Sequence, residues 1–389
     1  MYNNKSEIIR KYYCDLIQAC FEGKKPHSIP DDVSEEELID YATRGQIQYP
    51  VFTSLLKTNI SEISKEKIVP IIKACTLNTF LQVFGAKKIT EEFEKNQIRH
   101  QLLKGSVIKD IYPSPEMRQM SDIDLIVYDE TLDKAAEILE NMGFKNHGLI
   151  KHHMVFTNDA GLCVEVHWCL VDKSVDKAQY LHFKDNFNSK LMDGYKYTYE
   201  FSLEDFYVYL IAHMAKHFFE TGCGIRNLVD IYIYQNKYSD EMNKDYIDKE
   251  LKACGIFDFE EHMRELAYIW LENRECPSFY ENLFAYMLDC GIYGKGENGI
   301  WSQLAKETSE KSGNLKIHYY FPSLDFMKEK YTWLKKAPFL LPVGWVIRAF
   351  SGLFSKEACK HMELFTATSD ENANAMMEIY HKLGLNYRR

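Results

Sequence analysis

The chain of 389 residues lacks several features that point to common classes of protein. It has ten cysteines but no CxxC pair and no short regular cysteine spacing, which favours reduced, buried thiols over a disulfide framework or a cysteine zinc site. It has no block of lysines and arginines, and its formal net charge is −10, which argues against a nucleic-acid partner. The first residues lack the apolar core of a signal peptide, so we expect a cytoplasmic protein.

The composition predicts a large buried core, because 46% of the residues are hydrophobic and 14% are aromatic. The length allows more than one domain, and we see neither an internal repeat nor a low-complexity segment. We expect an N-terminal helical region over 1–95, a central core over 96–200 and a C-terminal helical domain over 201–389.

Apolar residues recur at helical spacing toward both ends of the chain. The predicted helices are Ile8–Phe21, Ser34–Arg44, Lys65–Lys95, Ser202–Phe218, Ile225–Gln235, Glu260–Asn273 and Ser278–Asp289. The central part reads differently. Its predicted elements are a short strand at Gln97–Leu103, a helix at Thr131–Met142, and two strands joined by a turn, His153–Thr157 and Leu162–Trp168.

Two carboxylates in the segment 122–127 (DIDLIV) carry the strongest chemical signal in the chain. Strand alternation places Asp122 and Asp124 on one face, with Ile123, Leu125 and Val127 on the other. Carboxylates this close repel each other in a low-dielectric cleft unless a positive charge lies between them, so we expect a divalent metal there. The alternative is an exposed strand end with solvated acids. The Gly-Ser pair upstream and a further carboxylate downstream weaken that alternative.

The further carboxylate is Glu165, in the segment 164–168 (VEVHW). Alternation places Glu165 and His167 on the same face of this strand. If the strand lies beside 122–127, three carboxylates converge at one end of a sheet, as they must to hold two Mg²⁺ ions for nucleotidyl transfer. Taken alone, Glu165 could also be an acid on an edge strand.

Together these residues resemble the nucleotidyltransferase superfamily with the DNA polymerase β-like fold, whose signature is a Gly-Ser turn, an Asp-x-Asp strand and a later carboxylate. More narrowly, they are similar to a family of uncharacterised bacterial nucleotidyltransferases. The matching positions are Leu103-Lys104-Gly105, Tyr112-Pro113, Arg118, Asp122-Ile123-Asp124-Leu125, Val164-Glu165-Val166-His167-Trp168, His213-Met214-Ala215-Lys216-His217-Phe218, Gly224, Arg226, Asp230 and Leu340-Leu341-Pro342. The resemblance covers residues 34–350 and is strongest over 102–168.

The resemblance implies an α+β fold, with a mixed β-sheet of roughly five strands flanked by helices and helical regions before and after it. It also implies an NTP donor, with ATP expected, two Mg²⁺ ions and transfer of a nucleoside monophosphate to a hydroxyl. Asp122 and Asp124 would bind both metals, and Glu165 would complete the catalytic metal site and help to deprotonate the acceptor. Gly105 and Ser106 would hold the β- and γ-phosphates through backbone N–H groups.

The link between the Gly-Ser pair and the Asp pair is longer than the superfamily pattern usually has. Fifteen residues separate Ser106 from Asp122, and Pro113 and Pro115 predict a loop within the link. Lys104 and Arg118 flank this segment. Each is either a phosphate contact or an ordinary surface cation.

Several further residues are candidates for the pocket. His167 could ligate or orient a ligand, or could be a satisfied core histidine. His213 and His217 share a helix face, but their sequence HMAKH lacks the glutamate of a zinc helix, which favours core or pocket lining. Arg226 and Asp230 are spaced to pair with each other on a helix, or to line the acceptor pocket.

One late segment, 337–354, is strongly apolar but short for a transmembrane helix, and it contains Pro342 and Arg348. A core helix is our main interpretation. The alternative is a peripheral membrane or protein contact, with Lys335, Lys336 and Arg348 as its basic side.

The sequence therefore predicts a nucleotidyltransferase that acts on a hydroxyl of a small molecule or a protein, with NTP as donor. The alternative, from another class, is a non-catalytic nucleotide-binding or partner-binding protein that keeps the fold.

Overall fold

The computed structural model describes residues 4–127, 131–150, 153–172, 176–185, 189–307 and 315–385. The α-helices are α1 Asn4–Phe21, α2 Glu35–Arg44, α3 Gln48–Leu55, α4 Glu62–Lys95, α5 Gly105–Ile108, α6 Leu132–Asn141, α7 Lys177–Asp185, α8 Leu203–Thr221, α9 Arg226–Tyr238, α10 Lys244–Ala253, α11 Phe257–Leu271, α12 Ser278–Cys290, α13 Gly299–Glu307, α14 Leu315–Tyr320, α15 Leu324–Lys330, α16 Leu341–Leu353, α17 Lys356–Ala367 and α18 Asp370–Lys382. The 3₁₀-helices are η1 Lys109–Ile111, η2 Pro115–Met117, η4 Gly296–Asn298, η5 Thr332–Lys335 and η6 Pro338–Leu340. The strands are β1 His100–Leu102, β2 Ile123–Val127, β3 Lys145–Ile150, β4 His153–Thr157, β5 Cys163–His167, β6 Ser189–Leu191 and β7 Thr198–Phe201.

The strands form one mixed sheet, so the predicted α+β class is confirmed. Within the described residues the sheet has seven strands in the order β3-β4-β5-β2-β1-β7-β6, more than the resemblance suggested. At its centre β2 pairs in parallel with β5 and antiparallel with β1. Strands β4 and β5 form the expected hairpin, closed by a turn in which Asn158 N–H donates to Leu162 O.

Helix ends follow the local sequence signals. Ser34 caps α2 in a capping box with Glu37, and Ser202 caps α8 by accepting from the backbone N–H of Asp205. The predicted long helix starts three residues earlier, at Glu62, where Ser61 caps it. We did not predict α3, α10, β3, β6 or β7 from the sequence, although Asn243 caps α10 by accepting from the backbone N–H of Tyr246.

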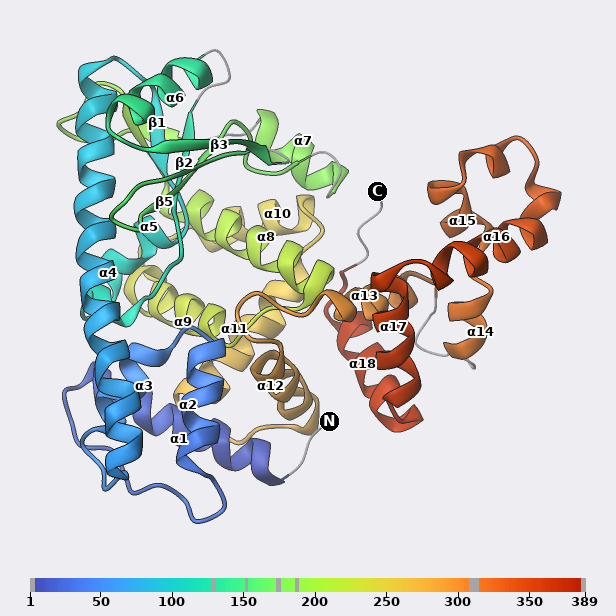
Figure 1. Cartoon of the computed structure of the whole chain (residues 1–389), viewed down its shortest axis with the longest axis horizontal. Helices are drawn as coiled ribbons and strands as arrows, with labels where there is room; N and C mark the ends of the chain where they lie inside the picture. Colours follow the sequence, from blue (N-terminus) through green and yellow to red (C-terminus); the bar gives the residue numbers. More distant parts are fainter. Residues whose placement is uncertain are drawn as a thin grey trace.

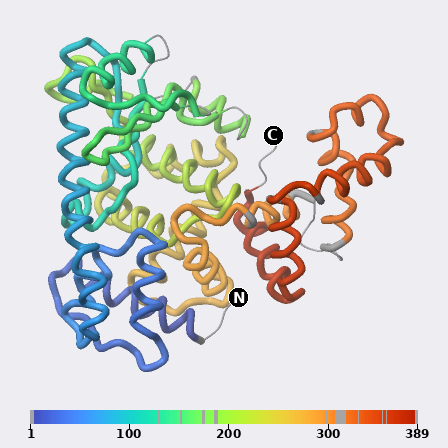
Figure 2. Tube along the Cα trace, in the orientation of Figure 1, coloured from blue at the N-terminus to red at the C-terminus, as the bar shows by residue number. Residues whose placement is uncertain are grey.

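The sheet and the terminal helices are arranged around two hydrophobic clusters (Figures 1 and 2). The smaller cluster joins one face of the sheet to α6 and the C-terminal half of α4, and it includes Ile89, Leu125 and Val166. The larger cluster holds the N-terminal helices together with α8 to α12. In Figure 1, α4 runs the length of one side of the molecule, from the N-terminal helices to the sheet, so it ties the two clusters together.

Among the described helices, α4 is long and apolar enough to cross a membrane by length and composition alone. One such helix is weak evidence, because the core helices of soluble proteins pass the same test. Ile89 and Phe93 of α4 are fully buried against the sheet cluster. The apolar window of this helix is nevertheless largely uncovered, since only 28% of it is buried and Leu77, Phe80 and Phe84 are exposed.

Two glycine-containing loops pack against each other between α8 and the η4 region. A Cβ atom on Gly224 would lie 2.8 Å from the carbonyl carbon of Gly291 and 2.9 Å from Ile292 N. The loop that begins at Gly291 carries Tyr293, whose hydroxyl hydrogen-bonds with Gln46 and Ser121. The close approach of the two loops thus places a side chain beside the residue that precedes Asp122.

Replacing Gly224 with Ala is expected to lower the free energy of unfolding by about 1–3 kcal/mol, because the added methyl meets backbone that cannot move aside. Thermal or urea unfolding would measure this loss. Gly296→Ala is the matched control, since its Cβ would meet nothing within 4 Å. Equal stability of the two variants would contradict the prediction.

The main interpretation of 337–354 as a core helix is wrong. The segment forms η6 and α16, which lie in a lobe at one side of the molecule (Figure 1). Phe339 is 79% exposed and Phe350 is 63% exposed, so the apolar side chains of this segment largely face outward.

Candidate active site

The site is built on β2, whose alternation matches the prediction. Ile123, Leu125 and Val127 are buried in the cluster beneath the sheet. Asp122 precedes the strand and Asp124 lies within it, and Asp124 is 4% exposed on the opposite face. A carboxylate buried this deeply requires compensating partners, because desolvation of an unpaired charge costs several kcal/mol.

Strand β5 supplies the third carboxylate. The parallel register places Glu165 directly beside Asp124, so the two side chains share one face of the sheet. His167, two residues further along β5, approaches both acids, with Nε2 2.9 Å from Asp124 Oδ1 and 3.5 Å from Glu165 Oε2. The predicted adjacency of the two acidic strands is thus present, but the carboxylate oxygens of Glu165 contact His153 and His167. Among the described residues, Asp122, Asp124 and Glu165 do not form a group whose ligand atoms all lie within 4.8 Å of one another.

Lys104 supplies the positive charge at this cluster. It precedes α5 with φ of +48°, and its Nζ lies 2.7 Å from Asp124 Oδ1. Burial lowers the pKa of Lys104, but the charge and hydrogen bond of Asp124, together with the charges of Tyr209 and Asp122, hold that pKa above its ordinary value. Burial raises the pKa of Asp124, yet Lys104 and His167 together hold it well below its usual range. Lys104 is therefore a site residue rather than a surface cation.

Asp122 is the acid that this single cation leaves uncompensated. Burial first, and then the negative charges of Asp124 and Glu165, raise the pKa of Asp122 to about 7. Burial raises the pKa of Glu165, but the hydrogen bond from His167 and the charges of His153 and Lys104 together hold that pKa below its ordinary value. The three acids therefore interact electrostatically, and near neutral pH the cluster has an excess of negative charge.

Replacing Asp122 with Asn is expected to stabilise the metal-free protein above neutral pH. The pKa of Asp122 is raised on folding, so the native state binds the extra proton and its stability falls as pH rises from about 4 to about 7. The Asn side chain does not ionise, so the variant does not lose this stability as pH rises. Its free energy of unfolding should exceed that of the wild type by about 1–2 kcal/mol at about pH 8, with little gain at about pH 4.

Denaturant unfolding in the presence of a chelator, at both pH values, would measure the difference. Asp159→Asn, at an exposed turn, is the control. An Asp122→Asn variant that is no more stable at the higher pH would show that the three acids do not repel one another in solution.

The Gly-Ser pair lies beside Lys104 at the start of α5. Gly105 is required by packing, since a Cβ there would lie 3.1 Å from Met120 Sδ. Ser106 N–H donates to Leu103 O, so it closes the turn and is not free to bind phosphate as the resemblance implied. Ser106 Oγ is buried and makes no hydrogen bond with any described residue, which leaves the hydroxyl as the group that can reach a ligand.

The predicted link through Pro113 and Pro115 folds as a loop with two 3₁₀ turns. In this loop the side chain of Arg118 pairs with Asp230. The guanidinium of Arg118 makes two hydrogen bonds of 2.8 Å to the carboxylate of Asp230, and both side chains are buried. Arg118 thus anchors this loop to α9. Its guanidinium also lies beside Gly105, where a Cβ would be 3.5 Å from Arg118 Nη1, so a phosphate contact by Arg118 stays a prediction. Asp230 is paired with Arg118 instead of the expected Arg226, whose guanidinium donates to Gln46 and to Gln119 O.

Helix α8 faces the acidic cluster from the helical side. Tyr209, His213 and His217 follow one another on its surface, and the Nε2 atoms of the two histidines are 3.1 Å apart. Burial first, and then the charge of Lys104, hold the pKa of His213 well below its usual range, which places it near the site. The predicted lining role agrees with this position. Among the described residues the two histidines belong to no group of three metal-binding side chains.

The sequence interpretation missed His153. In the β4–β5 hairpin His153 pairs with His167, and its Nε2 lies 3.6 Å from Glu165 Oε1. His153, Glu165 and His167 have ligand atoms within 4.8 Å of one another and could hold a metal ion. The hairpin register, counted outward from the turn at Asn158, would have revealed this pair.

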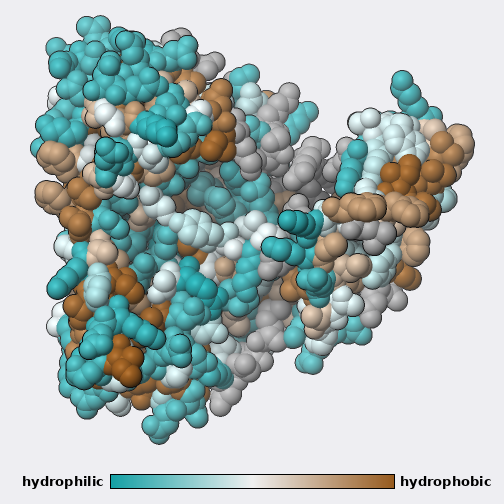
Figure 3. All heavy atoms as spheres, in the orientation of Figure 1, coloured by the Kyte–Doolittle hydropathy of each residue, from teal (hydrophilic) through white to brown (hydrophobic). Residues whose placement is uncertain are grey.

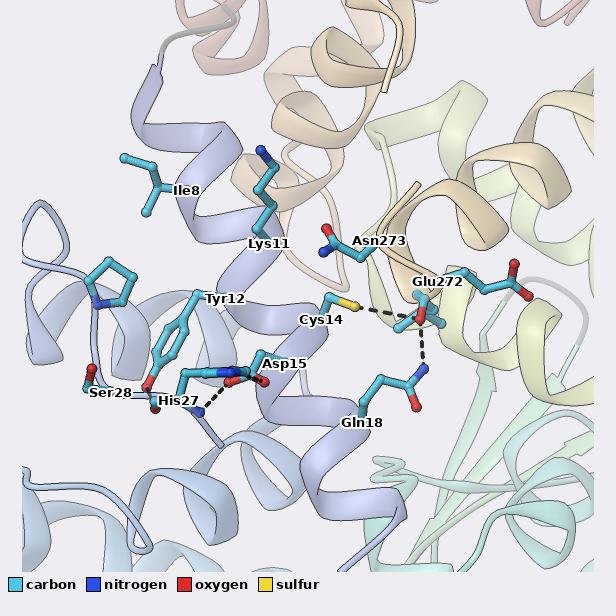
Figure 4. A pocket seen from close by; sticks show the side chains of 12 residues that line it. Ile8, Lys11, Tyr12, Cys14, Asp15, Gln18, His27, Ser28, Glu272 and Asn273 are labelled. Atoms are coloured by element: carbon cyan, nitrogen blue, oxygen red, sulfur yellow. Dashed lines mark hydrogen bonds and ion pairs between the residues drawn. The ribbon is translucent and has the colours of Figure 1, made fainter. Parts of the chain in front are cut away.

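A separate cavity of about 560 Å³ lies between α1 and the end of α11 (Figure 4). Its polar groups are largely satisfied by one another. Asp15 accepts from the backbone N–H of His27, and Gln18 donates to Leu271 O. The described residues that line this cavity include no acidic cluster comparable with that on β2 and β5, so it is a packing feature between helices.

A comparison with known families identifies the family of this chain. A family model described as uncharacterised nucleotidyltransferase matches residues 31–272. The match includes β1 to β7, the acidic cluster and helix α8. Searches of the curated proteins and of the solved structures each found no match. Because the family model covers more than half of a chain whose sheet brings together Asp122, Asp124 and Glu165, the protein belongs to this family of uncharacterised nucleotidyltransferases.

Proposed function

We propose that this protein transfers a nucleoside monophosphate from an NTP, with ATP the expected donor, to a hydroxyl group of a small molecule or a protein. The observation that carries the proposal is the convergence of Asp122, Asp124 and Glu165 on one face of the central strands, together with their mutual electrostatic coupling. Family membership supports the general reaction.

The donor set fits Mg²⁺, because this ion prefers carboxylate oxygens and the cluster has an excess of negative charge. Asp122 and Asp124 would hold two ions, and Glu165 would complete one of the two positions. Bound Mg²⁺ supplies charge neutralisation for the triphosphate and acidifies the attacking hydroxyl. Since Lys104 now pairs with Asp124, we propose that the ammonium turns from this carboxylate to a phosphate oxygen when Mg·NTP binds.

The reaction itself is a substitution at the α-phosphorus of the nucleotide. The acceptor oxygen forms a bond to this phosphorus, and the bond from the phosphorus to the bridging oxygen of the β-phosphate breaks, releasing pyrophosphate. Glu165 takes the proton of the acceptor hydroxyl. The hydroxyl of Ser106, which makes no hydrogen bond with a described residue, donates to the departing phosphates. Tyr209 and His213 on α8 line the side from which an acceptor would approach.

The choice of acceptor rests on charge. A nucleic-acid acceptor would require a basic groove to neutralise its phosphates, and the chain has a net charge of −10. A small molecule or a protein hydroxyl makes no such demand.

The test is to incubate the purified protein with Mg²⁺ and NTPs labelled at the α- or the γ-phosphorus, with cell extract as the source of acceptors. The proposal requires that only the α-label reaches an acceptor and that pyrophosphate is released. Transfer of the γ-label would show a phosphotransferase instead. Saturable binding of Mg·NTP without transfer to small molecules or proteins would favour the non-catalytic alternative, for which the Lys104–Asp124 ion pair is the supporting observation.

A further inference from the structure

The hairpin that borders the acidic cluster presents a second set of ligand atoms with a different chemistry. His153 on β4, and Glu165 and His167 on β5, share one face of the sheet. Their ligand atoms all lie within 4.8 Å of one another. This set contains two imidazole nitrogens, whereas the proposed Mg²⁺ ligands are all carboxylate oxygens.

The separations match the spacing of ligands around one ion. His153 Nε2 is 3.6 Å from Glu165 Oε1, and His167 Nε2 is 3.5 Å from Glu165 Oε2. Two ligand atoms bound at about 2.0–2.1 Å to a tetrahedral zinc ion are roughly 3.4 Å apart. Small side-chain rotations would therefore place all three around an ion, since the strands already fix their register.

We infer that His153, Glu165 and His167 form a binding site for a transition-metal dication of the zinc class, beside the carboxylate cluster. Imidazole nitrogen is a ligand that Zn²⁺ and its neighbours accept readily, whereas Mg²⁺ prefers oxygen alone. The donor set of two histidines and one carboxylate leaves a coordination position open, as in catalytic rather than structural zinc sites. The nearest further acid is Asp124, whose Oδ1 lies 2.9 Å from His167 Nε2.

Of the three proposed ligands, His167 is held rigidly in the sheet, and His153 and Glu165 are accessible to solvent. His167 is 4% exposed and fixed on a central strand, whereas His153 and Glu165 are 14% and 21% exposed at their side chains. An ion could thus enter from solvent and reach His167, whose Nε2 would exchange its hydrogen bond with Asp124 for the metal. The inference concerns metal binding alone and does not depend on nucleotidyl transfer, although both sites share Glu165.

The test is isothermal titration of the chelator-treated full chain with Zn²⁺, repeated with Mg²⁺. We expect about one Zn²⁺ per chain, and an affinity at least about 100-fold lower in His153→Ala, because a directly bound ligand contributes more than the outer-shell partners that cost 10–100-fold. His147→Ala is the matched control, since His147 lies on the same sheet and bonds to Thr157 away from the set. His153→Gln, with the thermal unfolding curve of each metal-free variant, separates ligand loss from misfolding.

Unchanged Zn²⁺ affinity in folded His153 variants would overturn the inference, because the ion would then bind elsewhere, for example at thiols. The Asp122→Asn variant separates the two proposals. It should retain Zn²⁺ binding while losing nucleotidyl transfer. Retained transfer in Asp122→Asn together with lost Zn²⁺ binding in His153→Ala would refute the proposed function and leave the metal site standing.

A different observation concerns the C-terminal lobe around α16. Its outward-facing apolar residues, here called the α16 surface, are Phe339, Val343, Val346, Ile347, Phe350 and Phe354. Figure 3 shows hydrophobic side chains gathered over this lobe, which stands apart from the sheet and the N-terminal helices. Phe354 is 90% exposed, so these side chains have not been covered by the chain itself.

The charged residues near the α16 surface indicate which kind of partner would cover it. Residues 330–356 include the cations Lys330, Lys335, Lys336, Arg348 and Lys356 and no Asp or Glu, with Glu329 and Glu357 directly flanking this range, in a chain whose net charge is −10. An apolar helix whose own segment carries cations and no acid is the pattern of a helix that lies in the interface of an anionic membrane. We propose that the α16 surface docks on anionic phospholipid bilayers.

Vesicle flotation tests this docking with the full chain. The protein should float with phosphatidylcholine–phosphatidylserine vesicles and less with phosphatidylcholine alone, and Phe350→Asp should abolish flotation. Phe80→Asp on α4 is the matched control, because Phe80 is 65% exposed and Phe350 is 63% exposed. The proposal would be overturned if the protein did not float with the anionic vesicles, or if both variants lost flotation equally. It would also be overturned if the protein did not bind vesicles and formed a dimer that Phe350→Asp dissociates.

Discussion

Replacing Asp124 with Asn should lower kcat for nucleotidyl transfer by at least about 1,000-fold, or roughly 4 kcal/mol of transition-state stabilisation. Asp124 is the buried centre of the cluster. It lies beside Glu165 in the β2–β5 register, within 2.7 Å of Lys104 and within 2.9 Å of His167. The amide keeps the shape and the strand but removes the charge that would hold divalent cations, so the fold should survive while turnover is lost.

Steady-state transfer of α-labelled nucleotide, with calorimetric Mg·NTP binding, would measure this effect. The Asp159→Asn variant, at the exposed hairpin turn, controls for the loss of a single negative charge. The circular dichroism spectrum of the Asp124→Asn variant should resemble that of the wild type, while its melting temperature should fall, because Lys104 is left buried without its carboxylate partner. Full activity in a folded Asp124→Asn variant would exclude the β2–β5 cluster as the catalytic site.

The second large effect is structural and concerns Arg118. Its replacement by Ala should lower the free energy of unfolding by about 3–5 kcal/mol, since it leaves the carboxylate of Asp230 buried without its cation. Arg118 and Asp230 are 4% and 1% exposed, and Tyr112 Oη is the other side-chain donor to Asp230, at 2.7 Å from Oδ1. The exposed pair Lys65–Glu62 is the comparison, and Lys65→Ala should cost less than about 1 kcal/mol.

The double variant Arg118→Ala/Asp230→Ala should be less destabilised than the sum of the two single variants, because it leaves no lone buried charge. Urea unfolding of the four proteins gives the coupling energy. The same variants test the role that the sequence suggested for Arg118. If Arg118→Ala leaves stability unchanged but raises KM for the NTP, the side chain contacts phosphate and the ion pair with Asp230 does not form in solution.

The local sequence pattern was sufficient to predict the strands and helices that hold the site residues. Alternation in 122–127 separated the two aspartates from the apolar residues, and burial of Ile123, Leu125 and Val127 confirms that assignment. Capping residues Ser34 and Ser202 placed the starts of α2 and α8. These signals depend on neighbouring residues, which the sequence displays directly.

The sequence did not reveal which residues far apart in the chain pair with each other. Arg118 and Asp230 are 112 residues apart, and the sequence offered Arg226 as a nearer partner for the same acid. The lysine of the Lys104-Gly105-Ser106 turn could have been at the surface, but the fold brings its ammonium onto Asp124. The apolar segment 337–354 looked like core, because hydropathy cannot tell whether another part of the chain will cover a helix.

The sequence by itself determined the α+β class, the family, and the strands that hold Asp122, Asp124 and Glu165, because each follows from local periodicity or from a motif. Only the tertiary structure decided which charges meet. Strand register placed Glu165 beside Asp124 and His153 beside His167, and packing of α9 against the Pro-containing loop paired Arg118 with Asp230. The physical reason is that buried charges must be neutralised by whatever groups the fold brings within a few ångströms, and those groups come from distant parts of the chain.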